Sequence, residues 1–80
     1  MPTVLRSGPF RFFFYAGDGN EPPHIHVERD ECQAKFWLEP VELANNRGFR
    51  EHELTQIQKI VDEHANIFVE RWNEYFGGQG

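Results

Sequence analysis

The 80-residue sequence contains a single cysteine and no long apolar run, and each scarcity excludes a class of protein. Cys32 alone cannot form an internal disulfide, so the chain is not a disulfide scaffold, and a free thiol fits a reducing compartment. No segment is apolar over the roughly 20 residues that a membrane-spanning helix needs. The N-terminus also lacks the pattern of a signal peptide. We therefore expect a cytoplasmic protein that does not enter a membrane.

Positive charge is also scarce. The sequence has eight Lys and Arg residues and thirteen Asp and Glu residues, which gives a formal net charge of −5. This balance argues against binding driven by nucleic-acid phosphates, although it allows a local basic patch and suits a basic partner. The length predicts one domain over residues 1–80. Eight Phe, two Trp and two Tyr exceed what a small core requires, so some aromatic area is expected to face a partner.

Glycine and proline are absent from residues 50–76, and this segment has the apolar spacing of a helix. The apolar positions are Leu54, Ile57, Ile60, Val61, Phe68, Trp72, Tyr75 and Phe76. The stripe is weakest over residues 63–66, which leaves one helix or a helical hairpin open. We favour the hairpin, because two helices cover a small sheet better than one. Gly77 and Gly78 are a helix stop signal.

The first half of the chain has short β-prone runs separated by proline and glycine. These runs predict strands over residues 3–6, 10–16, 24–29 and 33–38, with the first two paired as a hairpin. Residues 41–44 are expected to add a short extended segment, and residues 45–48 form a turn signal. The fold class is therefore α+β. We expect a small, mainly antiparallel sheet of three to four strands (residues 3–38) packed against a C-terminal helix or helical hairpin (residues 50–76).

The register of the third and fourth strands can be predicted from a tight loop at Asp30-Glu31. That loop sets four cross-strand pairs: Ile25 with Phe36, Val27 with Ala34, His24 with Trp37, and His26 with Lys35. The first two pairs place apolar against apolar on one face, as cross-strand packing prefers. The opposite face then carries His24, His26, Glu28, Lys35 and Trp37.

The segment from Glu21 to Glu28 concentrates the chemistry of the chain. His24 and His26 are two residues apart on a strand, which places both imidazoles on one face about 7 Å apart. Neutral imidazole is a ligand for zinc, iron, nickel or copper. The candidate ligands of a divalent metal are His24, His26 and Glu28, with Glu21 or Asp18 as alternative third ligands. Lys35 opposite His26 weakens this hypothesis, because a cation disfavours a nearby metal.

Two further hypotheses use the same face and require no cofactor. The first is general acid–base catalysis, for example in a small RNase, with His24, His26, Lys35 and Tyr15 as catalytic candidates and Arg11 as a phosphate contact. The second is protein interaction, with Trp37, His24, His26 and Arg47 as partner-binding candidates. A homo-oligomer is compatible with this second hypothesis. The plainest alternative makes the histidines half-exposed strand residues, with His24 stacked on Trp37 and His26 near Glu28.

Several motifs together resemble a family of small bacterial proteins catalogued as domain of unknown function 4160. The motifs are residues 1–6, 11–15, 21–27, 34–38, 46–49 and 72–76, among which the Pro-Pro-His-x-His-Val core at 22–27 is the most specific. Genes of this family often lie beside one for domain of unknown function 2442, so the resemblance implies a two-gene, toxin–antitoxin-like module. It implies a protein partner encoded by the neighbouring gene and an RNA-directed activity as a further option, but no established catalytic residues. Arg50 departs from the N-capping Ser common in relatives.

These observations lead to two expectations for function. The first is a component of a toxin–antitoxin-like module that acts through a protein partner. The alternative is a small hydrolase or RNase, with or without a metal, that uses His24 and His26.

Overall fold

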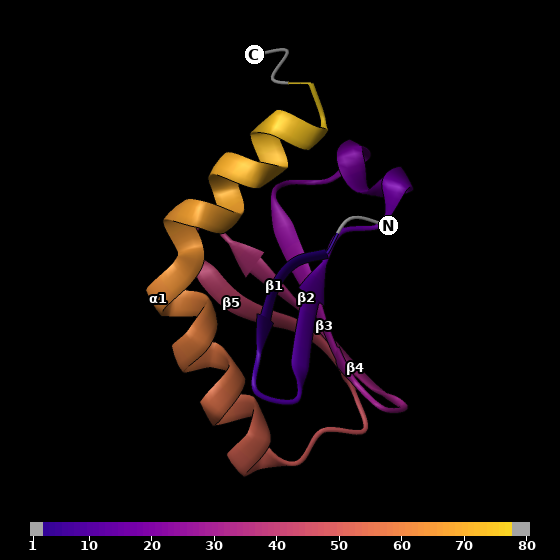
Figure 1. Ribbon diagram of the computed structural model, residues 1–80, viewed down its shortest axis with the longest axis vertical. Coiled ribbons are helices and arrows are strands. Elements are labelled where there is room, and N and C mark those ends of the chain that lie inside the picture. The colour runs from indigo at the N-terminus through magenta and orange to yellow at the C-terminus, as the bar shows by residue number, and fades with distance from the viewer. Residues whose placement is uncertain (1–2, 78–80) are drawn as a thin grey trace.

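Five antiparallel strands form one sheet, and a single long helix covers one of its faces (Figure 1). The computed structural model describes residues 3–77. Its elements are β1 (Thr3–Ser7), β2 (Phe10–Phe13), the 3₁₀ helix η1 (Ala16–Asn20), β3 (His24–Arg29), β4 (Cys32–Leu38), β5 (Val41–Arg47) and α1 (Glu51–Tyr75). The strands lie in the sheet in chain order, so every neighbouring pair is a hairpin. The α+β fold class is confirmed, with one strand more than expected.

The predicted register of β3 and β4 is confirmed for all four pairs. Asp30 in the loop between these strands has a φ of +56°, a left-handed conformation that aspartate tolerates better than most residues. The hairpin of β1 and β2 is also confirmed, although β2 ends at Phe13 rather than at residue 16.

The turn predicted over residues 45–48 is wrong for most of that segment. The fifth strand continues through Arg47, where its backbone pairs with Gln33 of β4. Asn has low strand propensity, so the extension through Asn45 and Asn46 depends on pairing with β4 rather than on local preference. The chain reverses only at Gly48, whose φ is +98°. A side chain there would also approach the sulfur of Cys32, since an added Cβ would lie 3.0 Å from Sγ.

The helical hairpin that we favoured is wrong, because α1 is one helix of 25 residues. Val61 and Phe68 are both fully buried, and their spacing of seven residues is close to two helical turns. The apolar stripe therefore stays on one side of the helix through the polar stretch at residues 63–66. No helix of the described residues has both the length and the apolar character to cross a membrane.

The start of α1 is held by side chains other than the residue at its N-cap position, Arg50. The carboxylate of Glu53 accepts a hydrogen bond from the backbone N–H of Arg50 at 3.1 Å and also pairs with the guanidinium of Arg29 on β3. The side chain of Asn46 exchanges two 3.1 Å hydrogen bonds with the backbone of Phe49. These contacts fix the helix start to β3 and to the end of β5, although Arg50 makes no side-chain hydrogen bond as a cap.

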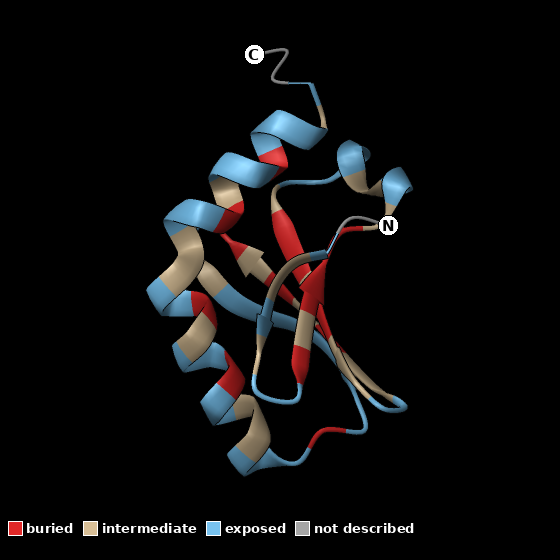
Figure 2. Cartoon of the chain, in the orientation of Figure 1, coloured by how far each residue is buried: buried red, intermediate tan, exposed pale blue. Residues whose placement is uncertain are grey.

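The main core lies between the sheet and α1, where Figure 2 shows buried residues on both layers. Phe12 of β2 stacks on Phe68 of α1 with ring centroids 5.5 Å apart. Other fully buried members of this core are Ile25, Val27, Phe36, Ile57 and Val61. Each such side chain stabilises the fold by roughly 1.5–3 kcal/mol through the apolar area that it buries.

The other side of the sheet, which we call the uncovered face, carries two rows of paired residues. One row is Phe13, His26, Lys35 and Asn45, and the other is Arg11, Glu28, Gln33 and Arg47. Phe13 is fully buried here although no helix covers it. Its ring contacts those of Tyr15 and His26, with centroids 5.0 and 5.5 Å away, and the Arg11 guanidinium lies 4.5 Å from its centroid. Aromatic and charged side chains therefore replace the helix as its cover.

Candidate metal centre

One carboxylate and two imidazoles meet at the edge of the uncovered face. Asp18 comes from η1, whereas His24 and His26 come from the start of β3. Oδ2 of Asp18 lies 3.1 Å from Nε2 of His24 and 3.0 Å from Nε2 of His26. One potential ligand atom from each of the three residues lies within 4.8 Å of the other two. Among residues 3–77, this is a group of three side chains that could hold a metal ion.

The loop before β3 folds back so that Asp18 reaches the histidines. Oδ2 of Asp18 accepts a 2.9 Å hydrogen bond from the backbone N–H of Tyr15, and the N–H of Asp18 donates to the carbonyl of Tyr15 at 3.1 Å. Gly19 lies against the ring of Phe76 just beyond α1, where an added Cβ would lie only 2.8 Å from Cδ1. The turn is therefore fixed both by its own hydrogen bonds and by close packing on the end of the helical segment.

His24 is completely buried, and its ring is held in a defined orientation. Its Nδ1 lies 3.0 Å from the carbonyl oxygen of Pro22, which can only accept, so Nδ1 carries a hydrogen and donates it. Its Nε2 is buried and makes no hydrogen bond, even though Asp18 is within ion-pair distance. The carboxylate oxygen is therefore close to Nε2 but not aligned to receive a hydrogen from it.

His26 is half-buried, and burial lowers the pKa of its imidazole despite the opposing attraction of Asp18. Its ring stacks on Phe13 and contacts that of Tyr15, with centroids 5.5 and 4.6 Å away. A lowered pKa keeps the ring neutral near pH 7, which is the protonation state that binds a metal.

The ammonium group of Lys35 is paired with Glu21 beside this cluster. Nζ of Lys35 lies 2.6 Å from Oε1 of Glu21 and 4.5 Å from the ring centroid of Trp37. The same Glu21 oxygen lies 3.7 Å from Nδ1 of His24. The hydrogen bond from Lys35 lowers the pKa of Glu21, so this carboxylate is ionised and balances the cation. The charge that weakened the metal hypothesis is thus balanced in part by Glu21, while burial lowers the pKa of His26 and Lys35 still contributes to that lowering.

The structure brings together only some of the residues that the sequence singled out. Glu28 lies on the uncovered face, but its carboxylate pairs with Arg11 at 2.6 Å and lies outside the Asp18–His24–His26 group. Of the alternative third ligands, Asp18 joins the histidines. Tyr15 lies beside His26, and its hydroxyl accepts a 2.9 Å hydrogen bond from Gln33. Among the partner-binding candidates, Arg47 is exposed, Trp37 and His26 are half-buried, and His24 is buried.

One contributor to the site was missed by sequence reasoning. Trp72, in the last turns of α1, packs its ring 4.9 Å from that of His24, while Trp37 contacts the same imidazole edge-on at 5.6 Å. Trp72 was assigned only to the apolar stripe of the helix. Its contact with His24 depends on where α1 ends relative to the sheet, and no local sequence signal reports that position.

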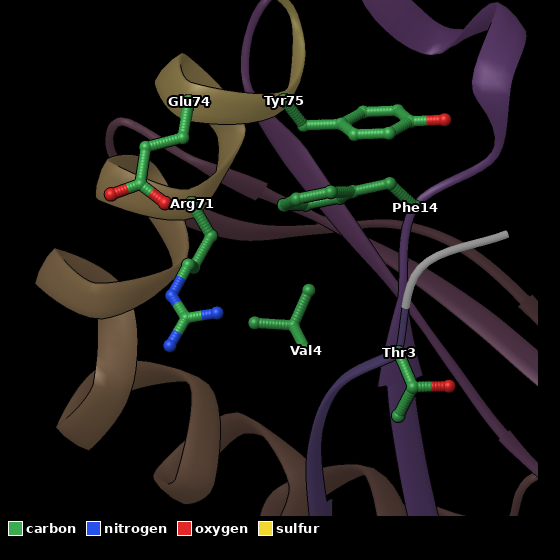
Figure 3. Close-up of a pocket in the computed structure, with 6 residues that line it drawn as sticks. All are labelled: Thr3, Val4, Phe14, Arg71, Glu74 and Tyr75. Atoms are coloured by element: carbon green, nitrogen blue, oxygen red, sulfur yellow. The ribbon is translucent and has the colours of Figure 1, made fainter.

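Two hollows flank this region. A small one, of about 100 Å³, opens on the uncovered face and is lined by His26, Gln33, Ala34, Lys35, Asn45 and Arg47. A larger one, of about 290 Å³, lies between β1 and the C-terminal end of α1 (Figure 3). Phe14 and Tyr75 stack there with centroids 6.3 Å apart, and Arg71 and Glu74 line its helical side. The larger hollow contains none of the three clustered ligands, so the small one is the relevant space.

Comparison with known proteins places the chain in a family without assigning an activity. The searches found no match among curated proteins or among solved structures. The model of one family, described as Domain of unknown function (DUF4160), matches residues 10–73, which include β2, η1, all of β3 to β5 and most of α1. The chain therefore belongs to the DUF4160 family.

Proposed function

We propose that Asp18, His24 and His26 bind a divalent transition-metal ion and that the protein is a small metal-dependent hydrolase. The observation that carries this proposal is the buried Nε2 of His24. It has no hydrogen-bond partner, and it faces a carboxylate oxygen at 3.1 Å.

The tautomer of His24 explains why this contact calls for a cation. Because Nδ1 donates to the carbonyl of Pro22, a neutral ring has its lone pair on Nε2, directed into the space that it shares with Asp18. Two electron-rich atoms in contact repel each other unless a proton or a metal ion lies between them. The geometry provides no aligned hydrogen bond between Nε2 and the carboxylate, so a metal ion is the bridging cation that fits this contact. Metal-bound histidines commonly donate their other ring N–H to a backbone carbonyl, as His24 does.

The distances also suit a metal ion. Nitrogen and oxygen ligands lie about 2.0–2.2 Å from such ions. Ligands at right angles around a common ion are then about 3 Å apart. The 3.1 Å separation from Asp18 to His24 agrees with this value, and the 3.0 Å contact between His26 and Asp18 is a hydrogen bond that a metal ion would replace. Two histidines and one carboxylate leave coordination positions open, as in catalytic zinc and non-haem iron sites.

The surrounding residues suit hydrolysis. A divalent ion in such a site acidifies water and polarises an ester oxygen. The rings of Phe13, Tyr15 and Trp72 enclose the histidines, and this apolar surrounding strengthens electrostatic interactions at the site. The hydroxyl of Tyr15 lies at the same edge, held by Gln33, and can donate a hydrogen bond to a bound group.

The test is thermal unfolding of chelator-treated protein with and without Zn²⁺, Fe²⁺, Ni²⁺ or Mn²⁺. A ligand at about 100 times its Kd stabilises the fold by about 2.7 kcal/mol, so the Tm should rise by several degrees. His24→Ala and Asp18→Asn should abolish the rise.

Two matched variants separate the site from general metal binding by histidine or carboxylate. His52→Ala removes an exposed helical imidazole, and Glu28→Gln removes a carboxylate on the same face. Both should keep the full Tm rise. The proposal fails if none of the four metals raises the Tm, or if the rise survives in both His24→Ala and Asp18→Asn.

A second candidate function is the two-gene module that acts through a protein partner. The observation that favours it is β5, which forms one edge of the sheet and is exposed over six of its seven residues. The outer edge of such a strand can pair with an extended segment of a partner. Co-expression with the neighbouring gene product should yield a complex that Ala44→Pro disrupts. The absence of any complex on co-purification would contradict this candidate.

A further inference from the structure

The small hollow beside His26 is the strongest feature that the metal cluster leaves unexplained. We propose that it binds the phosphate group of a substrate, which makes phosphate esters the substrate class. Cleavage of a phosphate ester at this hollow rests on the proposed metal-dependent hydrolysis. Binding of phosphate to the hollow can be tested without a metal.

The hollow is built by three neighbouring strands of the uncovered face. His26 pairs with Lys35 and Lys35 with Asn45, so that one row crosses from β3 to β5. Gln33 pairs with Arg47 in the adjacent row. In an antiparallel sheet, directly paired residues project to the same face, so these side chains surround a common space. Its volume of about 100 Å³ suits a single compact group rather than a large ligand.

The chemistry of the lining suits an oxyanion. Arg47, Gln33 and Asn45 all carry N–H donors, and guanidinium groups bind phosphate with two parallel hydrogen bonds. Within residues 3–77, no carboxylate lies within ion-pair distance of Arg47, whereas Arg11 and Arg29 are each paired with one. Among the described residues, Arg6, Arg50 and Arg71 likewise have no carboxylate within that distance, so what distinguishes Arg47 is its place beside the amides of Gln33 and Asn45 at a polar hollow.

His26 joins the hollow to the metal cluster. It lines the hollow, and its Nε2 lies 3.0 Å from Asp18. A phosphate held by Arg47 would therefore lie on the side of His26 that faces the hollow, with Asp18 in contact with the same imidazole. In hydrolysis, the oxygen of water bonds to phosphorus and the bond from phosphorus to the ester oxygen breaks. The leaving oxygen takes up the proton that the water loses.

The experiment is a titration of the full chain with inorganic phosphate, followed by ¹H–¹⁵N NMR. Saturable shifts are expected for the side-chain amides of Gln33 and Asn45 in chelator-treated protein. Arg47→Gln should weaken binding by about tenfold or more, because it removes charge-assisted hydrogen bonds. Arg71→Gln is the matched control, since Arg71 is an exposed arginine of α1 that lines the other hollow. It should leave phosphate binding unchanged.

The outcomes separate the two proposals. If phosphate shows no saturable binding, or if Arg47→Gln and Arg71→Gln behave alike, the phosphate subsite is overturned even where metals raise the Tm. If phosphate binds in an Arg47-dependent manner but no metal raises the Tm, the subsite stands and metal-dependent hydrolysis fails. Circular dichroism of both variants confirms that neither has lost its fold.

Discussion

The two faces of the sheet use the same strands for different purposes. On β4, Phe36 is fully buried under α1, whereas its neighbour Lys35 lies on the uncovered face with its ammonium on Glu21. On β3, Ile25 and Val27 pack into the core, and His26 between them faces Asp18. Alternation along a strand therefore separates the residues that stabilise the fold from those that form the candidate site. The two histidines lie on a strand that a helix holds in place, and such a position keeps its geometry better than a loop does.

The largest expected effect is on the covered face. Phe36→Ala should lower the free energy of unfolding by about 3–5 kcal/mol, because it removes a fully buried ring and leaves a cavity. Lys35→Ala, one residue away on the other face, should cost about 1 kcal/mol or less, as for other partly exposed ion pairs. Urea denaturation measures both. Equal losses would show that the uncovered face also carries much of the stability.

A smaller effect is expected where η1 contacts the helical end. Gly19→Ala places a methyl group 2.8 Å from Cδ1 of Phe76, so either the ring of Phe76 or the loop that carries Asp18 must shift. We expect a loss of about 1 kcal/mol or more from overpacking, together with a smaller metal-induced Tm rise. Gly17→Ala is the control, because an added Cβ there meets nothing within 4 Å. If both variants bind metal like the unmodified protein, close packing at Gly19 does not position Asp18.

The Arg11–Glu28 pair tests how much the charges of the uncovered face stabilise the fold. Glu28→Gln removes one partner of a 2.6 Å contact whose side chains are 17% and 34% exposed. The expected loss is about 0–1 kcal/mol, measured by urea denaturation. A loss well above that range would show that the Arg11 guanidinium, which lies over the ring of Phe13, depends on Glu28 for its position.

Glu53 links α1 to β3 through its ion pair with Arg29. Hydrogen bonds from the backbone of Arg50 and from Arg29 hold the pKa of Glu53 below its ordinary value of 4.5. A carboxylate with a lowered pKa in the folded state contributes stability above the unfolded pKa and loses it as the pH falls through the folded pKa. Glu53→Gln should therefore be less stable than the unmodified protein at pH 7, and the difference should shrink below about pH 4.5.

Urea denaturation at pH 7 and again at pH 3 to 4 checks this sign. If the difference in free energy of unfolding between Glu53→Gln and the unmodified protein stays constant or widens in acid, Glu53 acts through packing rather than through its charge. His52, its neighbour in the first turn, is exposed, so His52→Gln provides a control for changes at the helix start.

Local patterns predicted most of the fold. The two-residue loop at Asp30-Glu31 was enough to fix the register of β3 and β4, because a slip of one residue would have turned Ile25 and Val27 out of the core. The fifth strand was underestimated because Asn45 and Asn46 have low strand propensity, so the end of this strand depends on its pairing with β4. The break in the helix was wrongly favoured because residues 63–66 are polar, although Val61 and Phe68 on either side face the same core.

The candidate site was predicted less completely than the fold. His24 and His26 share a site edge as their spacing suggests, but the sequence left Glu28, Glu21 and Asp18 open as the third ligand. Only Asp18 lies with the two histidines, because η1 folds back over them while Glu28 pairs with Arg11. The burial of His24 was not predicted, because Trp72 is 48 positions later in the chain and reaches His24 only through the docking of α1.

By itself, the sequence determined the fold class, the register of the central hairpin and the identity of the two imidazoles, because these follow from periodicity, turn chemistry and spacing over a few residues. The tertiary structure decided which carboxylate joins them, where the cation of Lys35 points, and whether Arg47 lines the same hollow as His26. Those outcomes depend on contacts between segments that are distant in the chain. Such contacts form only when the sheet and the helix bury their apolar faces together.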